Sequence, residues 1–486
     1  MWGFNKAKLK KTKTRVVRSK ARGFSAGEDS YTLGDFKGSN LSIDADLVTN
    51  LRKMRGRSRT LAHDNDYAKK YLSMVRSNVI GAAGFTLQAK AKNSKGDLDQ
   101  SDNAYIEKVF KAWGRKDSCT MSKQLTWLDV QQLFIESVAR DGEALCVLHY
   151  GSNLKYGFSL QMVDIDLLDE THCRKLNNGN EIRLGVEQDV YGAPVAYHLL
   201  TSHPDDISNY RYNGKKYSRI PADRIIHAFK AERAGQSRGV PWMHSSIRRL
   251  NMLGGMEEAE LVASRVSASK MGFFTSADGE GYSGDEESDD GTLITDAEPG
   301  TFEQLPEGVS FQAFDPQHPA TAFDSFVKLV LRGAASGLGV AYNSLANDLE
   351  GVSFSSIRSG TIEERDNWKQ KQTWMVDHFC MPIYLAWLRA AILKGELNLP
   401  VSKLEKFEEA IFQGRGFSWV DPRSDSIANE QGVNMGTTTR ADIAAAQGKN
   451  LEDIFEQLQR EKELAMKYGI NVNGLTGDKK DEEKDD

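Results

Sequence analysis

The chain has 486 residues, of which 40% are hydrophobic and 27% are charged, and its formal net charge is −5. These values are typical of a globular protein with roughly two to four compact units, and they exclude an extended disordered chain. The four cysteines, Cys119, Cys146, Cys173 and Cys380, form no CxxC pair, which argues against a zinc module and a disulfide framework. There is no run of about 18 apolar residues and no apolar core after the N-terminus, so we expect neither a membrane-spanning helix nor a cleavable secretory signal.

The charges are unevenly distributed along the chain. Positions 1–22 hold nine Lys and Arg and no acid, whereas positions 271–327 hold thirteen Asp and Glu and neither Lys nor Arg. Segregation on this scale concerns partners or solubility rather than the fold. Two interpretations stay open for each segment, namely a contact surface or a solvated stretch of chain.

The first part of the chain is predicted to be mostly helical. Apolar spacing predicts a helix over 62–79, preceded by a dense set of basic residues at 52–59, and Gly81 and Gly84 end it. A strand is expected to begin at 85–88. Further helices are predicted over 103–113 and from Trp127 onward, with Asp129 in the first turn of the latter.

From Glu143 the apolar period changes to two, which predicts β-strands. The expected strands have turn residues between them and cover 144–150, 158–163, 182–187, 195–200 and 224–229. The fold class is therefore α+β, with a β-rich unit between helical ones.

The second half is again helical in pattern. We expect helices over 243–271, 323–340 and 357–393, and Pro382 should kink or split the last of these. The acidic stretch separates the first two. Shorter helices are predicted near 427–435 and 451–468, and the polar tail 471–486 is expected to be disordered.

Signatures of catalysis and of cofactor binding are missing. Neither Gly-Lys pair is followed by Ser or Thr, as a phosphate-binding loop requires, and the Gly-rich run 333–339 is best interpreted as a packed helix end. His198 and His203 with Asp205 and Asp206 come nearest to a metal cluster. Asp164 and Asp166, which alternate on a predicted strand, could hold a nuclease metal, although a solvated sheet face is the commoner explanation. We expect no catalytic residue, no cofactor and no metal.

Several passages, spread in order over positions 60–465, resemble the lambda-type family of phage portal proteins. They are 65–71, 77–81, 185–197, 225–229, 235–242, 257–263, 342–346, 352–360 and 419–422. None is diagnostic alone, and the order and spread make the resemblance specific.

The resemblance implies a subunit of a dodecameric ring at one capsid vertex, through which double-stranded DNA is packaged and ejected. It implies a basic arm (1–24), a wing (25–242), two stem helices (243–271 and 320–341), an acidic clip (272–319), a tunnel-loop region with a long helix (342–394), a crown (395–470) and a disordered tail (471–486). The candidate tunnel-loop residues are Asn347, Asp348, Leu349, Glu350, Gly351, Val352 and Ser353.

The implied partners are the terminase large subunit, head–tail connector proteins and the major capsid or scaffold protein, in the virion and, during assembly, in the host cytoplasm. Docking of terminase or connector is expected at Asp285, Glu286, Glu287, Asp289 and Asp290. The basic arm has three interpretations: contact with packaged DNA, contact with scaffold or capsid, or a flexible arm. Two other functions stay open: a metal-dependent DNA-processing enzyme that uses Asp164 and Asp166, and a lattice-forming capsid or baseplate protein.

Overall fold

The computed structural model describes residues 40–206, 216–268, 323–418 and 421–469, together with four short strands between 272 and 313. The chain divides into two units, Met1–Ser42 and Ile43–Asp486, and the elements below belong to the second. The predicted basic arm at 1–24 and the predicted tail at 471–486 lie outside the described residues.

The first elements are two helices joined at one capping residue. α1 (Ile43–Asp64) and α2 (Asp66–Val75) meet at Asn65, whose side chain accepts a hydrogen bond from the Ala68 amide, and a π-helical turn, η3 (Arg76–Ile80), follows. The helix predicted over 62–79 is therefore present, but the helical region begins earlier. The short strand β1 (Thr86–Ala89) pairs antiparallel with β14 (Ala410–Gln413), so it joins the two halves of the chain.

Three helices come next, α3 (Gln100–Trp113), α4 (Lys116–Cys119) and α5 (Trp127–Asp141). α5 begins at a reciprocal cap: the Thr126 hydroxyl oxygen accepts from the Asp129 amide, while the Asp129 carboxylate accepts from the Thr126 amide. Phe134 and Val138 on this helix are buried, as their spacing predicts. The sequence predictions for α3 and α5 are confirmed.

The β-rich part contains two antiparallel sheets. A three-stranded sheet has the order β3-β2-β9, formed by β2 (Glu143–Tyr150), β3 (Phe158–Val163) and β9 (Ile225–Phe229). A five-stranded sheet has the order β4-β5-β6-β7-β8. Its strands are β4 (Arg174–Lys175), β5 (Glu181–Arg183), β6 (Val186–Gln188), β7 (Pro194–Leu200) and β8 (Tyr217–Pro221).

The prediction of one strand over 182–187 is wrong, because this segment is a tight hairpin. Leu184 and Gly185 connect β5 to β6 with φ values of 51° and 87°, the two left-handed positions of a hairpin turn. Gly185 also permits close packing, since a Cβ there would lie 2.8 Å from Leu168 Cδ1. Leucine rarely adopts this conformation, so the segment carries no recognisable turn signal.

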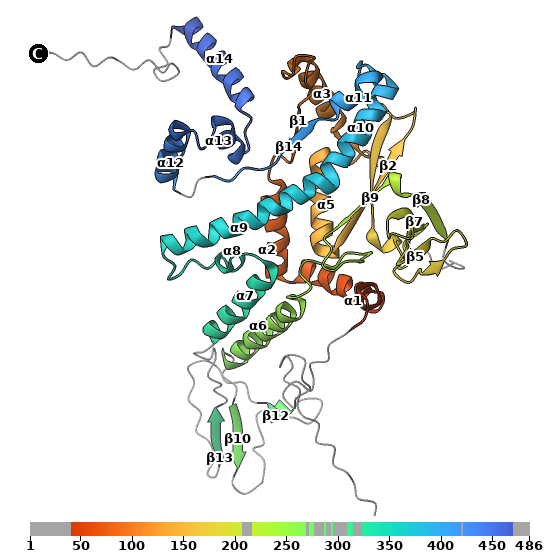
Figure 1. The fold of residues 1–486 in the computed structure, drawn as a ribbon. Coiled ribbons are helices and arrows are strands. Elements are labelled where there is room, and N and C mark those ends of the chain that lie inside the picture. Colours follow the sequence, from red (N-terminus) through yellow and green to blue (C-terminus); the bar gives the residue numbers. More distant parts are fainter. Residues whose placement is uncertain are drawn as a thin grey trace, which may run out of the picture. The chain divides into compact units, whose positions relative to one another are not determined.

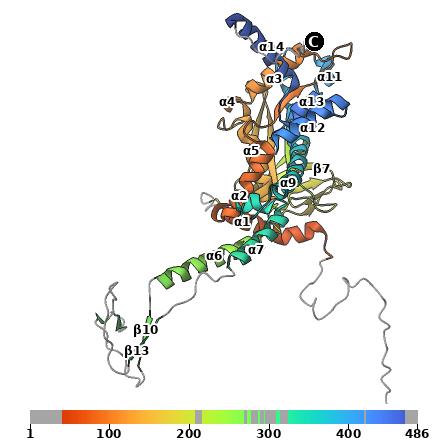
Figure 2. The ribbon, with the colours of Figure 1, turned by 90° about the vertical axis from the view of Figure 1, so that its left-hand side faces the viewer.

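Two helices, α6 (Ile247–Ala268) and α7 (Phe323–Leu338), lie side by side, as Figures 1 and 2 show. Between them the chain forms two antiparallel pairs, β10 (Gly272–Ser276) with β13 (Val309–Ala313), and β11 (Glu286–Glu287) with β12 (Leu293–Ile294). The predicted order of helix, acidic segment and helix is confirmed. α6 begins at Ile247, later than the predicted 243, and the last three residues of the predicted helix lie outside the described residues.

The next helices form one long continuous stretch. After α8 (Tyr342–Ala346), α9 (Phe354–Met375) runs through the π-helical turn η7 (Val376–Cys380) into α10 (Met381–Lys394). The predicted split at Pro382 does not occur. The π-helical turn η7 ends directly before Met381 and Pro382, so the hydrogen-bonding pattern of the helix changes where the proline has no amide to donate. Residues 355–394 are long and apolar enough to span a membrane, but the helix lies in the core, where Trp368, Phe379 and Trp387 are fully buried.

The last part of the described chain is helical apart from β14. Its elements are the short helix α11 (Leu404–Phe407), then α12 (Pro422–Met435), α13 (Arg440–Ala446) and α14 (Leu451–Tyr468). The predicted helices at 427–435 and 451–468 are confirmed. The main core joins α3, α5 and α10, where the ring of Phe110 lies 4.9 Å from that of Trp387, and the ring of Phe134 lies 3.8 Å from that of Phe379.

Candidate functional site

The α6–α7 pair is held together by close backbone approach. Ser246 Oγ donates to the Ala334 carbonyl and Ser245 Oγ to the Gly337 carbonyl, both at 3.2 Å. A Cβ at Gly337 would lie 2.6 Å from Ser246 Oγ, so the glycine is needed for this contact. The Gly-rich run 333–339 is therefore a packed helix end, as the sequence predicts.

The same helix pair exposes a wide apolar surface. Met252 is 62% exposed, Leu261 68% and Leu329 65%, and Phe326 borders a shallow groove next to Met252 and Met256. Leu250 and Leu253 are buried, so apolar side chains lie on more than one side of α6. A helix that is apolar around much of its circumference is normally covered by other protein.

The loop at 347–353 connects α8 to α9 and is ordered by its own hydrogen bonds. Asp348 accepts from the Tyr342 hydroxyl at 2.8 Å and from the Glu350 amide at 3.0 Å, and the Tyr342 bond lowers the pKa of Asp348. Asn347 and Gly351 adopt left-handed φ values, and Ser353 caps α9. Lys328 of α7 lies 3.4 Å from Glu350. Leu349 is exposed, and Asp348 and Glu350 are the charged residues of the loop.

A buried charge cluster around Glu143 connects α1 to the sheets. The Glu143 carboxylate accepts from Arg55 at 2.7 Å, from Arg238 at 2.9 Å and from the Gly239 amide at 2.9 Å, and His227 Nε2 lies 2.8 Å from it. Burial favours the neutral acid, but Arg238, His227 and Arg55 outweigh it and hold the pKa of Glu143 well below its usual value.

The Glu143 cluster also fixes the β5–β6 hairpin, because Arg238 Nη1 donates to the Leu184 carbonyl at 2.7 Å. We did not identify Glu143 from the sequence. A detectable signal was a carboxylate at the start of the otherwise apolar run Glu143–Leu148, with every residue of that run buried.

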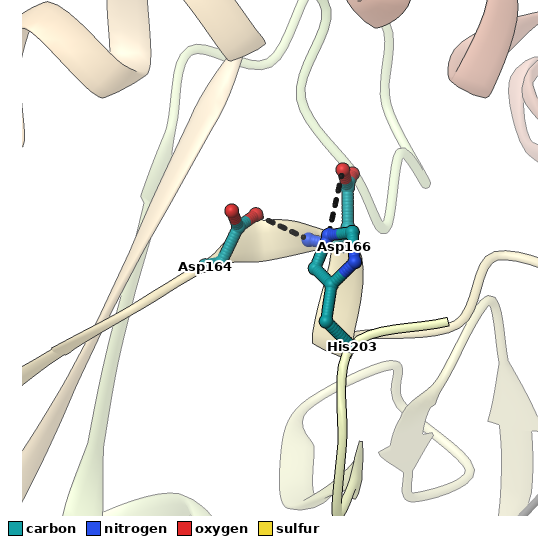
Figure 3. A group of neighbouring side chains, drawn as sticks. All are labelled: Asp164, Asp166 and His203. Atoms are coloured by element: carbon teal, nitrogen blue, oxygen red, sulfur yellow. Dashed lines mark hydrogen bonds and ion pairs between the residues drawn. The ribbon is translucent and has the colours of Figure 1, made fainter. Parts of the chain in front are cut away.

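Asp164, Asp166 and His203 come together, as Figure 3 shows, and their potential ligand atoms lie within 4.8 Å of one another. The prediction that the two aspartates alternate on a strand is wrong, because β3 ends at Val163 and Asp164 caps the 3-10 turn η4 (Ile165–Leu167). His203 Nε2 lies 3.6 Å from Asp166 Oδ2. These are the residue types of a cation site.

Guanidinium groups already occupy these carboxylates. Arg55 donates to one oxygen of Asp166 at 2.7 Å, while Arg59 donates to the other and lies 3.2 Å from Asp164. Burial would raise the pKa of Asp166, but the two arginines outweigh it and lower that pKa. The cluster therefore joins α1 to the end of β3 through ion pairs.

The predicted grouping of His198 with His203, Asp205 and Asp206 is not formed. His198 Nε2 lies 3.1 Å from Glu187, and Asp205 accepts from Arg52 at 2.5 Å. Of the five acidic residues predicted to dock partners, Asp285, Asp289 and Asp290 lie outside the described residues. Glu286 and Glu287 form β11, and their side chains are not among those described.

Comparisons with known proteins agree on one family. The model of the phage portal proteins of the lambda family matches residues 30–372. The probable portal protein of Halomonas phage phiHAP-1 is 35% identical over 479 residues, covering 96% of this chain and 92% of that one. Portal protein B of Escherichia phage lambda is 21% identical, covering 86% of this chain and 85% of that one.

Two solved particles contain chains similar to this one. The similarity to a chain in the virion of a native gene transfer agent has a TM-score of 0.43 at 11% identity, over 86% of this chain and 98% of that one. The similarity to a chain in the neck of the native particle has a TM-score of 0.41 at 12% identity, over 82% of this chain and 94% of that one.

Proposed function

The chain belongs to the lambda family of phage portal proteins, and from this membership we propose that it forms a dodecameric ring at one vertex of the capsid. Double-stranded DNA is packaged and ejected through this ring without sequence specificity. The family is structural rather than enzymatic, and we propose that ATP hydrolysis belongs to a separate terminase. The observation in this chain that best supports assembly is the exposed apolar surface of α6 and α7.

We assign α6 and α7 to the stem of the ring and the segment 272–319 to the clip between them. Residues 25–242 form the wing, and 395–470 form the crown. The assignment is supported by the α6–α7 contact and by the two strand pairs that lie between these helices in the sequence.

The proposed stem interface can be tested by charge insertion. Leu329→Glu places a carboxylate on the apolar surface of α7 and should cost about 2 kcal/mol or more per interface, as at a central apolar anchor. Sedimentation velocity should then show loss of the ring. Leu393→Glu is the control, because Leu393 is 78% exposed at the end of α10, away from the helix pair. Rings of wild-type stability in Leu329→Glu would contradict the interface.

We further propose that the loop 347–353 faces the DNA. Its charged residues are acidic, so the loop would not bind the DNA phosphates. A basic loop would bind them, and each neutralised phosphate would steepen the fall of log K with log salt concentration by about 0.9. The double variant Asp348→Lys with Glu350→Lys should slow DNA movement and make packaging depend on salt concentration. Glu396→Lys changes the charge elsewhere and should package normally. Unchanged packaging in the double variant would contradict the proposal that the loop faces the DNA.

Docking of terminase or connector at the acidic segment remains a proposal from charge alone. Deleting 285–290 should impair packaging or tail joining while rings still assemble. Wild-type packaging by this deletion would refute the docking site.

The alternative of a metal-dependent enzyme rests on Asp164, Asp166 and His203. The pairing of both aspartates with arginines weakens it, because a cation would have to displace Arg59. Asp164→Ala distinguishes the two functions: an enzyme would lose metal-dependent turnover, whereas a portal would retain packaging. The lattice-forming alternative predicts sheets of protein rather than closed rings.

A further inference from the structure

A cavity of about 500 Å³ lies where the end of α7, the middle of α9 and the segments 230–232 and 240–244 meet. Its polar lining includes Lys230, Glu232, Trp242, His244, Asn367 and Lys371. It is separate from the Glu143 cluster and from the loop 347–353. The cavity is large enough for water and a small polyatomic ion.

Lys371 is the unusual residue of this cavity. Its ammonium lies 4.3 Å from the ring centre of Trp368 and 5.3 Å from that of Trp242. Aromatic faces stabilise a cation, but they offer no charged acceptor. Among the described residues, the ammonium groups of Lys371 and Lys230 form neither a hydrogen bond nor an ion pair.

The carboxylate whose charge acts on Lys371 is Glu364, and it is already used by other donors. Glu364 accepts from Ser344 Oγ at 2.8 Å and from the Ala341 amide at 3.3 Å through one oxygen, and from Trp368 Nε1 at 3.0 Å through the other. Glu232, the acid in the cavity lining, lies 3.7 Å from His244 Nε2. Among the described residues, no carboxylate therefore pairs with the ammonium group of Lys371.

A third donor is also left without an acceptor. Trp242 Nε1 is buried and has no hydrogen-bond partner in the part of the chain that the structure describes. Buried N–H groups are normally satisfied. The indole N–H groups of Trp127 and Trp387 also lack a partner among the described residues, but only Trp242 of these three lines the cavity. Two lysines and a tryptophan with an unpartnered indole N–H therefore line the cavity, and the lysines carry positive charge.

We propose that this cavity binds one anionic oxygen group, a carboxylate or an oxyanion such as phosphate or sulfate, with Lys371 and Trp242 Nε1 as donors. The group can come from two sources, a free ion or a carboxylate side chain of a second copy of this chain. The second source rests on the ring proposed above.

The charge state of Lys371 supplies an independent signature. Burial and the like charge of Lys230 lower the pKa of Lys371 to about 8. Only the protonated lysine attracts an anion, so affinity for sulfate should fall about 25-fold between pH 7.5 and 9.5. Lys230, Glu232, Glu364, Tyr71 and His244 also face this region. Sulfate itself does not titrate in this range.

The test uses the full chain and two lysine variants. Lys371→Met keeps an aliphatic chain on the Trp faces and removes the charge, whereas Lys369→Met removes a lysine paired with Asp366 on the exposed side of the same helix. Calorimetry with sulfate on dissociated protein should give binding in wild type and Lys369→Met, and at least a tenfold loss in Lys371→Met. Sedimentation without sulfate then compares ring formation by the same variants.

The outcomes separate the two sources and separate this proposal from the ring itself. Sulfate binding lost in Lys371→Met, with ring formation unchanged, identifies a free-ion site. Weaker rings in Lys371→Met than in Lys369→Met, together with dissociation of wild-type rings by added sulfate, identify a neighbour's carboxylate. Equal sulfate binding and equal ring formation in the two variants would overturn the proposal. Absence of rings in wild type would refute the proposed function, while the calorimetry would still test the cavity.

Discussion

The region around Glu143 and the region around α6 and α7 differ in how far their side chains are paired or covered within the chain. Glu143 is completely buried, yet donors from α1, β9 and the segment 238–239 satisfy it. Around α6 and α7, by contrast, Leu261 and Leu329 stay exposed, and Lys371 of α9, which shares a cavity with the end of α7, has no acceptor among the described residues. A region that satisfies its own groups builds the subunit, whereas one that leaves them unmatched indicates where other molecules bind.

The largest effect expected from this contrast is at the satisfied cluster. Glu143→Gln leaves buried Arg238 without its counter-charge and Arg55 with Asp166 alone, so it should destabilise the chain by about 3–5 kcal/mol. Denaturant unfolding measures this loss. Glu181→Gln is the matched control, because Glu181 pairs with Arg183 on the surface and should cost less than about 1 kcal/mol. Equal effects of the two variants would mean that the buried cluster does not organise the fold.

The pH dependence should locate the same cluster. Burial lowers the pKa of His227, although Glu143 opposes this, and the pKa of Glu143 itself is held low. In both cases the unfolded chain takes up a proton first, so stability is complete above about pH 6.5 and falls as the pH decreases. His227→Gln should flatten the upper part of this decline and leave the part below about pH 4.5 in place. A melting temperature that rises on acidification would contradict these assignments.

A smaller change in stability, with opposite signs at two glycines, tests whether α6 and α7 are closely packed. Gly337→Ala gains about 1 kcal/mol of helix propensity but pushes a methyl group against Ser246, so a net loss of about 1 kcal/mol is expected. Gly56→Ala in α1 meets nothing within 4 Å and should stabilise by about 0.5–1 kcal/mol. Thermal unfolding of the two variants below the concentration of assembly measures both. Stabilisation by both substitutions would show that α6 and α7 are not closely packed.

The smallest effect concerns the loop 347–353. Tyr342→Phe removes the hydroxyl that donates to Asp348 and should cost about 0.5 kcal/mol, the lower end for a single hydrogen bond, because both residues are only partly buried. Hydrogen exchange at the Glu350 amide should increase, since Asp348 also accepts from it. Unchanged exchange would indicate that the Asp348 bonds do not order the loop.

Local features of the fold could be predicted from the sequence, because their causes lie within a few residues. The start of α5 at Trp127 with Asp129 in its first turn, the apolar spacing of α5 and the order of α6, acidic segment and α7 are examples. The β5–β6 hairpin was missed because a buried leucine takes a left-handed position that turn residues normally occupy. That conformation depends on packing against Leu168 and on the bond from Arg238, which are distant in sequence.

For the candidate sites, the sequence indicated the residue types but not the side chains with which they pair. Asp164 and Asp166 do approach His203, but Arg55 and Arg59 lie more than 100 residues earlier in the chain, and no local pattern links them to these acids. Lys371 was not predicted for the same reason. Its surroundings come from α9 and from residues near Trp242, which the fold alone brings together.

Electron microscopy of the purified full chain tests the central claim most directly. A portal subunit should form closed rings with an axial hole, and Leu329→Glu should abolish them while Leu393→Glu does not. Extended sheets formed by the wild-type protein would contradict the account. So would a wild-type protein that stays monomeric together with the Leu393→Glu control.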